Sequence, residues 1–130
     1  MIFLDSSYIL SLIFENDINH LKAMQLRYLI EDEAKMINNT VINEVLNSLE
    51  PNYSKIDINY IIDRLLSIHK IDFLNFDDYI TSIKIFKYYN QSINFADCTI
   101  LKSMFDNNIN HIISFDSDFD KIKGIRNVNF

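Results

Sequence analysis

Two short apolar runs in the chain each stop abruptly at an aspartate. The first covers Met1–Leu4 and precedes Asp5, and the second covers His111–Phe115 and precedes Asp116. A short apolar run with polar boundaries is typical of a strand buried on both faces of a parallel sheet. Segments with weaker strand character lie between them, at Lys35–Asn38 and Ile71–Leu74. The pattern therefore predicts buried strands, two of which lead directly into an acid.

Between these strands, apolar residues recur at helical spacing. The clearest helix is predicted over Asp57–His69, where Ile58, Ile61, Ile62, Leu65 and Leu66 follow the i, i+3, i+4, i+7, i+8 pattern. Another is predicted over Asn19–Ile30, with Leu21, Met24 and Leu29 facing inward. The other helices are expected from Asp5, Ser6 or Ser7 to about Phe14, over Val41–Leu49 with Thr40 as N-cap, over Asp77–Tyr89, and over Asn94–Asp106 with Asn94 as N-cap.

This order of strands and helices predicts an α/β fold. Helical crossovers between strands give a mostly parallel central sheet flanked by helices on both faces, in three layers. The chain has 130 residues, of which 48% are apolar, so residues 1–130 are expected to form a single domain. Gly124 is the only glycine, which excludes glycine-rich phosphate-binding loops.

Charge and cysteine content narrow the function further. The net charge of −6 argues against a protein that holds nucleic acid chiefly by a basic surface, unless acids converge on divalent cations that cancel their charge locally. Cys98 is the only cysteine, so no internal disulfide forms and a cytoplasmic location is expected. No apolar run approaches the length of a membrane-spanning helix, and no membrane partner is expected.

One helical acid falls inside an apolar stripe. On the Asn94–Asp106 helix, about 100° per residue places Asp97 between Ile100 and Leu101 on the buried side. An isolated ionised carboxylate at such a position is strongly disfavoured, so it must be neutralised, hydrogen-bonded or bound to a cation. An aspartate that caps its own helix is the alternative interpretation.

A second helical acid could join it. Val41, Val45 and Leu49 mark the buried side of their helix, and Glu44 lies at the margin of that stripe, where its side chain can reach a cleft. In parallel sheets functional groups gather beyond the carboxyl ends of the strands, where Asp5 and Asp116 lie. Four converging carboxylates would bind Mg²⁺ or Mn²⁺, and such a site suits hydrolysis of a phosphodiester.

Four sequence motifs resemble those of PIN-domain ribonucleases, and in particular the VapC-type toxins of toxin–antitoxin pairs. They are Ile2-Phe3-Leu4-Asp5-Ser6-Ser7, Asn43-Glu44-Val45-Leu46, Ala96-Asp97-x-x-Ile100, and Ile112-Ile113-Ser114-Phe115-Asp116-Ser117-Asp118-Phe119. The resemblance spans nearly the whole chain, in the order of the family. It implies a three-layer PIN-like fold and metal-dependent endoribonuclease activity, with RNA as the substrate.

The resemblance also assigns residue roles. It makes Asp5, Glu44, Asp97 and Asp116 the catalytic acids that hold Mg²⁺ or Mn²⁺. Ser114 would orient a carboxylate or water, and Asp118 matches an additional acid that is frequent in the family. Ser6, like Ser7, is expected to cap a helix or support the acids by hydrogen bonds. The resemblance further implies a homodimer and a cognate antitoxin protein that blocks the cleft.

Some positions depart from the family pattern. Lys102 stands where the family usually has a small residue, and it would either point outward or reach the phosphate backbone of a substrate. Asn107, Asn108 and Asn110 replace the usual loop glycines, because asparagine tolerates left-handed conformations.

Three other functions are compatible with parts of the sequence. One is a PIN-fold RNA-binding or assembly module with little turnover. Another is a receiver-like signalling domain, which also clusters acids at strand ends. An EF-hand starting at Asp116 is disfavoured, because Lys121 stands where the loop needs glycine and Asn127 where it needs glutamate.

Overall fold

The fold is organised around a five-stranded, all-parallel sheet. A computed structural model describes residues 1–128. Its strands lie in the order β3-β2-β1-β4-β5. The strands are β1 (Ile2–Leu4), β2 (Lys35–Asn38), β3 (Lys70–Asp72), β4 (His111–Ile113) and β5 (Arg126–Asn127). This order differs from the 2-1-3-4-5 order of receiver-like folds, so the receiver alternative is wrong.

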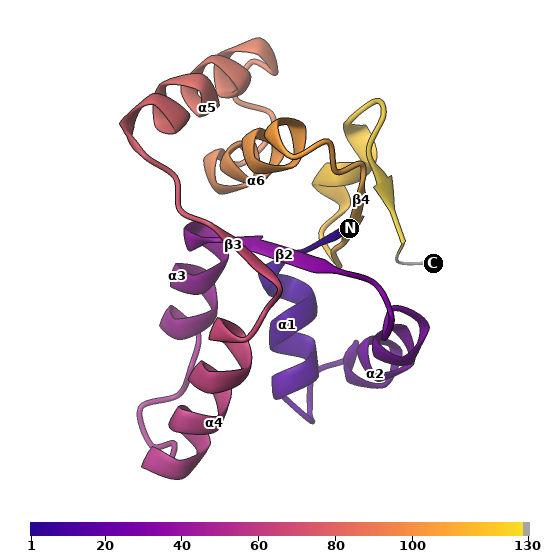
Figure 1. The fold of residues 1–130 in the computed structure, drawn as a ribbon, viewed down its shortest axis with the longest axis vertical. Helices are drawn as coiled ribbons and strands as arrows, with labels where there is room; N and C mark the ends of the chain where they lie inside the picture. The colour runs from indigo at the N-terminus through magenta and orange to yellow at the C-terminus, as the bar shows by residue number, and fades with distance from the viewer. Residues whose placement is uncertain (129–130) are drawn as a thin grey trace.

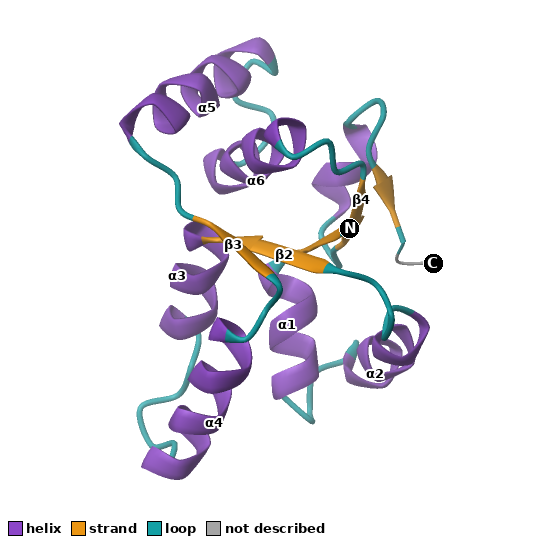
Figure 2. Cartoon of the chain, in the orientation of Figure 1, coloured by secondary structure: helices purple, strands orange, loops and turns teal. Residues whose placement is uncertain are grey.

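Helices cover both faces of the sheet, as predicted for a three-layer α/β fold. They are α1 (Ser6–Ile13), α2 (His20–Leu29), α3 (Asn39–Asn47), α4 (Lys55–Leu66), α5 (Phe76–Tyr88) and α6 (Phe95–Asp106). Helices α5 and α6 pack together on one face, and α1 to α4 lie on the other (Figure 1). Figure 2 shows the strands as the middle layer. A 3₁₀ helix, η1 (Ser117–Lys121), follows β4.

Short polar side chains begin several of these helices. Asn94 accepts from the Ala96 N–H at the start of α6, as predicted. The predicted cap of α3 is wrong, because Asn38 rather than Thr40 accepts from the Val41 N–H, at 3.1 Å. Thr40 is instead a residue of the first turn of α3, and its side chain is buried. The hydroxyl of Thr40 is therefore available for contacts with another element.

The core fills the space between the sheet and its helices. Its fully buried residues include Phe3, Met36, Ile37, Val41, Val45, Ile100, Leu101, Met104, Ile112 and Ile113. The apolar stripe predicted on α6 and the buried side predicted on α3 are thus confirmed at Val41 and Val45, whereas Leu49 lies beyond the end of α3 and is only partly buried. Within residues 1–128, no helix is long and apolar enough to cross a membrane.

The outer helices differ most from the sequence predictions. On α2, Leu21 and Leu29 are 78% and 66% exposed, and the buried residues are Ala23 and Leu26. Helix α4 ends at Leu66, and of the five apolar residues predicted to pack only Leu65 is fully buried. Both helices lie at the periphery of the molecule, where neighbouring elements cover only a narrow strip of each helix surface. Periodicity gives the direction of an apolar face, but it does not show whether another element covers that face.

The ends of the sheet also differ from prediction. Strand β3 was expected over Ile71–Leu74 but ends at Asp72, because its partner Asn38 is the last residue of β2. Strand β5 and helix η1 had no clear sequence signal. In the loop between α6 and β4, Asn108 adopts a positive φ of 54°, as expected of an asparagine that replaces glycine, whereas Asn107 and Asn110 do not.

Candidate metal centre

The predicted site lies where the strand order of the sheet reverses. From β1 the chain adds β2 and β3 on one side and then β4 and β5 on the other. Crossovers leave this point in opposite directions, which opens a crevice beyond the carboxyl ends of β1 and β4. Asp5 directly follows β1, and Asp116 follows β4 by three residues. The topology therefore brings two acids together that are 111 positions apart in the sequence.

Two serine hydroxyls hold the side chain of Asp5. Its Oδ2 accepts from Ser7 Oγ at 2.8 Å and from Ser114 Oγ at 2.6 Å. The same hydroxyls accept from the backbone, Ser7 from the Phe115 N–H and Ser114 from the Asp116 N–H. Each serine thus ties Asp5 to the segment after β4. Ser114 has the supporting position expected from the resemblance.

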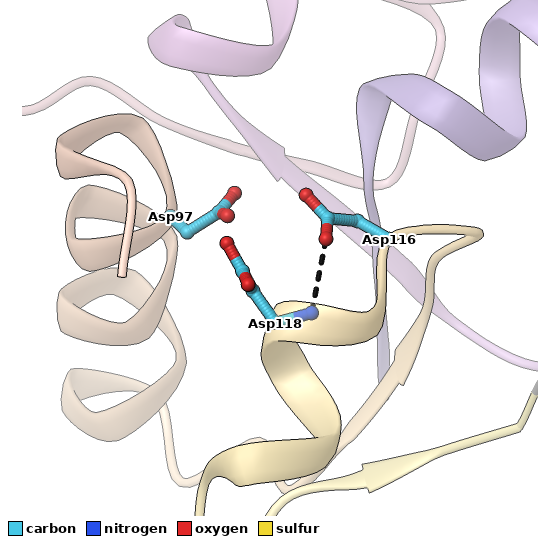
Figure 3. A group of neighbouring side chains, drawn as sticks. All are labelled: Asp97, Asp116 and Asp118. Atoms are coloured by element: carbon cyan, nitrogen blue, oxygen red, sulfur yellow. Dashed lines mark hydrogen bonds between the residues drawn. The ribbon is translucent and has the colours of Figure 1, made fainter. Parts of the chain in front are cut away.

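Three aspartates converge beside this pair of strand ends. One carboxylate oxygen from each of Asp97, Asp116 and Asp118 lies within 4.8 Å of the other two. Figure 3 shows Asp97 reaching from α6 toward the two acids of the β4–η1 segment. Asp116 also accepts from the Asp118 N–H at 2.9 Å, which fixes the start of η1. Asp118, the additional acid of the motif, is therefore part of the cluster.

Glu44 reaches the same region from the opposite helix layer. Burial raises the pKa of Glu44, and the charges of Asp5 and Asp116 raise it further, while a hydrogen bond from Ser6 lowers it. Glu44 is therefore close enough to Asp5 and Asp116 for their charges to act on it. Of the four acids predicted from the sequence, Asp97 and Asp116 share the group within 4.8 Å, and Asp5 and Glu44 lie outside that group but interact with it electrostatically.

The cluster is electrostatically unfavourable when it holds only carboxylates. Burial and then the charges of Asp5, Asp116, Asp118 and Glu44 raise the pKa of Asp97 to about 8. Burial also raises the pKa of Asp5, against the lowering effect of its serine partners. Such shifts show that the folded chain favours proton uptake here, or the binding of another cation.

Two buried oxygens indicate which cation the site fits. Asp97 is 6% exposed, yet its Oδ2 finds no hydrogen-bond partner among the described residues, and neither does Glu44 Oε1. A buried carboxylate oxygen without a partner is costly, and a metal ion satisfies it. All nearby donors are oxygens, which suits a hard divalent cation such as Mg²⁺ or Mn²⁺ better than a thiophilic metal.

Sequence reasoning anticipated one supporting residue, missed a second and left a third open. Ser7 was expected to cap a helix or to support the acids, and its hydroxyl donates to Asp5, two residues before it. Asn127 exchanges two hydrogen bonds with the backbone of Ser114, and its strand gave no signal. Lys102 pairs with Asp106 and with Asp78 of α5, so it links the two helices of one layer.

Replacing Ser114 by alanine is expected to lower the free energy of unfolding by about 1–3 kcal/mol, because Asp5 and the Asp116 N–H both lose a buried partner. Urea unfolding monitored by circular dichroism measures this loss. The matched control is Ser117→Ala, since Ser117 is exposed on the adjacent helix. Equal stability of both variants would show that Ser114 does not support the acids.

The sheet order and the acid-lined crevice define a three-layer α/β protein with a candidate metal centre. Residues 2–125 match the PIN domain family. This match covers most of the chain, which therefore belongs to the PIN domain family. No curated protein sequence matches it.

Solved structures share the same fold. One is Mycobacterium tuberculosis VapC20, a sarcin–ricin loop cleaving toxin, with a TM-score of 0.78 and 20% identity over 92% of this chain and 93% of that one. Another is Rickettsia felis VapBC2 bound to a DNA fragment from their promoter, with a TM-score of 0.71 and 16% identity over 100% and 99%. Neisseria gonorrhoeae FitAcB has a TM-score of 0.63 and 16% identity over 91% and 89%.

Proposed function

We propose that this protein is a metal-dependent endoribonuclease that hydrolyses RNA phosphodiester bonds. The observation that carries the proposal is the cluster of acids at the carboxyl edge of a PIN-domain sheet, with buried oxygens of Asp97 and Glu44 that lack partners. In that role Asp5, Glu44, Asp97 and Asp116 hold Mg²⁺ or Mn²⁺, with Asp118 beside them. A bound divalent ion would lower the pKa of an attacking water and offset charge on the phosphate.

The residues of the chain then have distinct tasks. Asp97 and Glu44 supply buried oxygens that accept no hydrogen bond from residues 1–128, and Asp116 and Asp118 extend the cluster toward solvent. Ser7 and Ser114 keep Asp5 oriented through their hydroxyls. Because the acids are net negative without a cation, a polyanionic RNA is admitted only once the metal has reduced that charge. Metal binding and substrate binding are therefore expected to be coupled.

We also propose that the protein is the cytoplasmic toxin of a toxin–antitoxin pair. Its fold matches VapC20, a sarcin–ricin loop cleaving toxin. A cognate antitoxin would block access to the acids, and a neighbouring cleft of about 530 Å³ between α1, α2 and α4, lined by apolar residues such as Leu12 and by charged ones such as Arg27, would hold a further part of it. A homodimer would cover part of α5, where Phe76, Ile80 and Ile83 form an exposed apolar stripe at helical spacing.

RNA cleavage is expected only when a divalent ion is present. Purified protein is incubated with total RNA and with ribosomes, in Mn²⁺, in Mg²⁺ and in excess EDTA, and the products are resolved on a gel. Cleavage in either metal and none in EDTA is the expected result. Cleavage that persists in EDTA contradicts the metal mechanism, and tight RNA binding without cleavage in any arm favours the RNA-binding or assembly module.

A further inference from the structure

A buried polar network lies at the carboxyl end of β2. The amide nitrogen of Asn38 donates to Ser103 Oγ at 3.0 Å and to the Thr99 carbonyl at 3.3 Å, both on α6. Its Oδ1 accepts from the Val41 N–H on α3. Asn38 and Ser103 are fully buried, so these contacts exclude water. A single side chain thus connects the last residue of β2 to helices on both faces of the sheet.

A second contact joins the same two helices directly. The hydroxyls of Thr40 on α3 and Thr99 on α6 lie 2.7 Å apart, and Thr99 Oγ1 lies 2.6 Å from the Ala96 carbonyl. Since Thr99 donates to that carbonyl, Thr40 donates to Thr99. Both threonines are buried. Helices α3 and α6 lie on opposite faces of the sheet (Figure 1), so this bond joins the two helix layers.

Each helix of this pair carries one of the acids with an unpartnered oxygen. Glu44 follows Thr40 by four residues, so the two side chains lie one turn apart on the same face of α3. On α6, Asp97 directly follows Ala96, whose carbonyl accepts from Thr99. The α6 residues that contact Asn38 and Thr40 are Ser103 and Thr99. They lie roughly 200–240° around the helix from Asp97. They therefore set the rotation of α6 and with it the direction of Asp97.

The acids themselves oppose this arrangement. Glu44 and Asp97 come from opposite layers, and each is close enough to Asp5 and Asp116 for their charges to interact. Like charges on partly buried carboxylates repel, and the repulsion acts to separate the helices that carry them. Buried hydrogen bonds across the layers resist that separation before any cation arrives.

We propose that Asn38, Thr40, Thr99 and Ser103 are positioning residues that hold Glu44 and Asp97 in register for a divalent metal ion. The inference rests on the proposed function in naming the metal as what the acids bind. A network that served only to begin α3 would need no contact with α6, because a serine at position 38 could cap the helix equally well. The side chain of Asn38 is long enough to reach α6 from β2, and the Thr40–Thr99 pair joins α3 to α6. Both therefore connect the two helix layers.

The test measures Mn²⁺ affinity by isothermal titration calorimetry on the full chain. Thr99→Val and Thr40→Val each remove one hydroxyl at nearly constant volume, and Thr40→Val leaves the bond from Thr99 to Ala96 intact. We expect either variant to weaken Mn²⁺ binding about tenfold, as is typical when groups that support metal ligands are lost. The matched control is Ser82→Ala, which removes a buried hydroxyl on α5 that donates only to its own helix.

Positioning and stability are separated by comparing variants. Ser82→Ala is expected to lose stability and keep its Mn²⁺ affinity within about twofold of wild type. In a Glu44→Gln background, Thr99→Val is expected to weaken binding much less, because one of the positioned acids is already absent. Asn38→Ser is expected to behave like Thr99→Val.

The outcomes distinguish the two proposals. The positioning role is overturned if Thr99→Val and Thr40→Val bind Mn²⁺ as tightly as wild type while Asp97→Asn binds it more weakly. That result leaves the proposed function intact. An equal loss of Mn²⁺ affinity in the Ser82→Ala control also overturns the positioning role. Wild-type protein that binds no Mn²⁺ overturns the proposed function, and the positioning role falls with it.

Discussion

Replacing Asp97 by asparagine is expected to abolish RNA cleavage while making the metal-free protein more stable. Asparagine keeps the shape of the side chain but removes a charge that is disfavoured, because burial and then the charges of neighbouring acids raise the pKa of Asp97 to about 8. At pH 8 the gain in the free energy of unfolding should be about 5 kcal/mol, since each pKa unit corresponds to about 1.4 kcal/mol. Cleavage should fall below about one-hundredth of wild type, since even indirect support of a metal ligand contributes 10–100-fold.

The matched control is Asp120→Asn, which makes the same chemical change at an exposed position of η1. Thermal unfolding in EDTA and cleavage of total RNA in Mn²⁺ are measured on both variants. Asp120→Asn should resemble wild type in both assays. An Asp97→Asn variant that is destabilised in EDTA, or that still cleaves, would show that the carboxylate is neither strained nor required.

The second large effect is the pH dependence of stability without metal. The folded pKa values of Asp97, Asp5 and Glu44 lie above their unfolded values, so the folded state binds more protons than the unfolded state between about pH 4 and pH 8. Stability therefore falls as pH rises through this window, by about 1.4 kcal/mol per pH unit for each proton held. Urea unfolding in EDTA at several pH values measures the slope.

Divalent metal should remove this loss. A cation takes the place of the bound protons, so Mn²⁺ is expected to stabilise the protein by about 2.7 kcal/mol at a hundredfold excess over its dissociation constant, more at pH 8 than at pH 5. The Asp97→Asn variant should show a shallower slope in EDTA and a smaller response to Mn²⁺. Stability of the metal-free wild type that rises steadily from pH 4 to pH 8 would contradict the raised pKa values.

The sequence predicted the inner elements of the fold better than the outer ones. Strands β1 and β4 and helix α6 pack in the middle of the molecule, where almost every apolar position is covered, so pattern and burial agree. Helices α2 and α4 have equally clear apolar spacing, yet much of their apolar surface is exposed. Their coverage depends on neighbours that periodicity does not specify.

The site shows the same division at the level of single residues. Asp97 was identified because an acid in a buried stripe conflicts with the cost of an unpaired charge. Its assembly with Glu44 and Asp116 was a hypothesis from buried faces and strand ends that the resemblance strengthened, because nothing local in the sequence measures the distance between α3, α6 and the end of β4. Asn127 was missed because an ordinary polar residue becomes a support only when the fold places it beside a residue that holds an acid, here Ser114.

By itself the sequence determined the elements, their alternation, the apolar interior and the presence of acids where apolar side chains were expected. These properties depend on the spacing of residues along the chain, which local geometry converts into buried faces. Only the tertiary structure decided that strand order reverses beside β1, that Thr40 meets Thr99 across the layers, and which oxygens lack partners. Those properties depend on distances between segments far apart in the chain, and packing of the whole domain sets such distances.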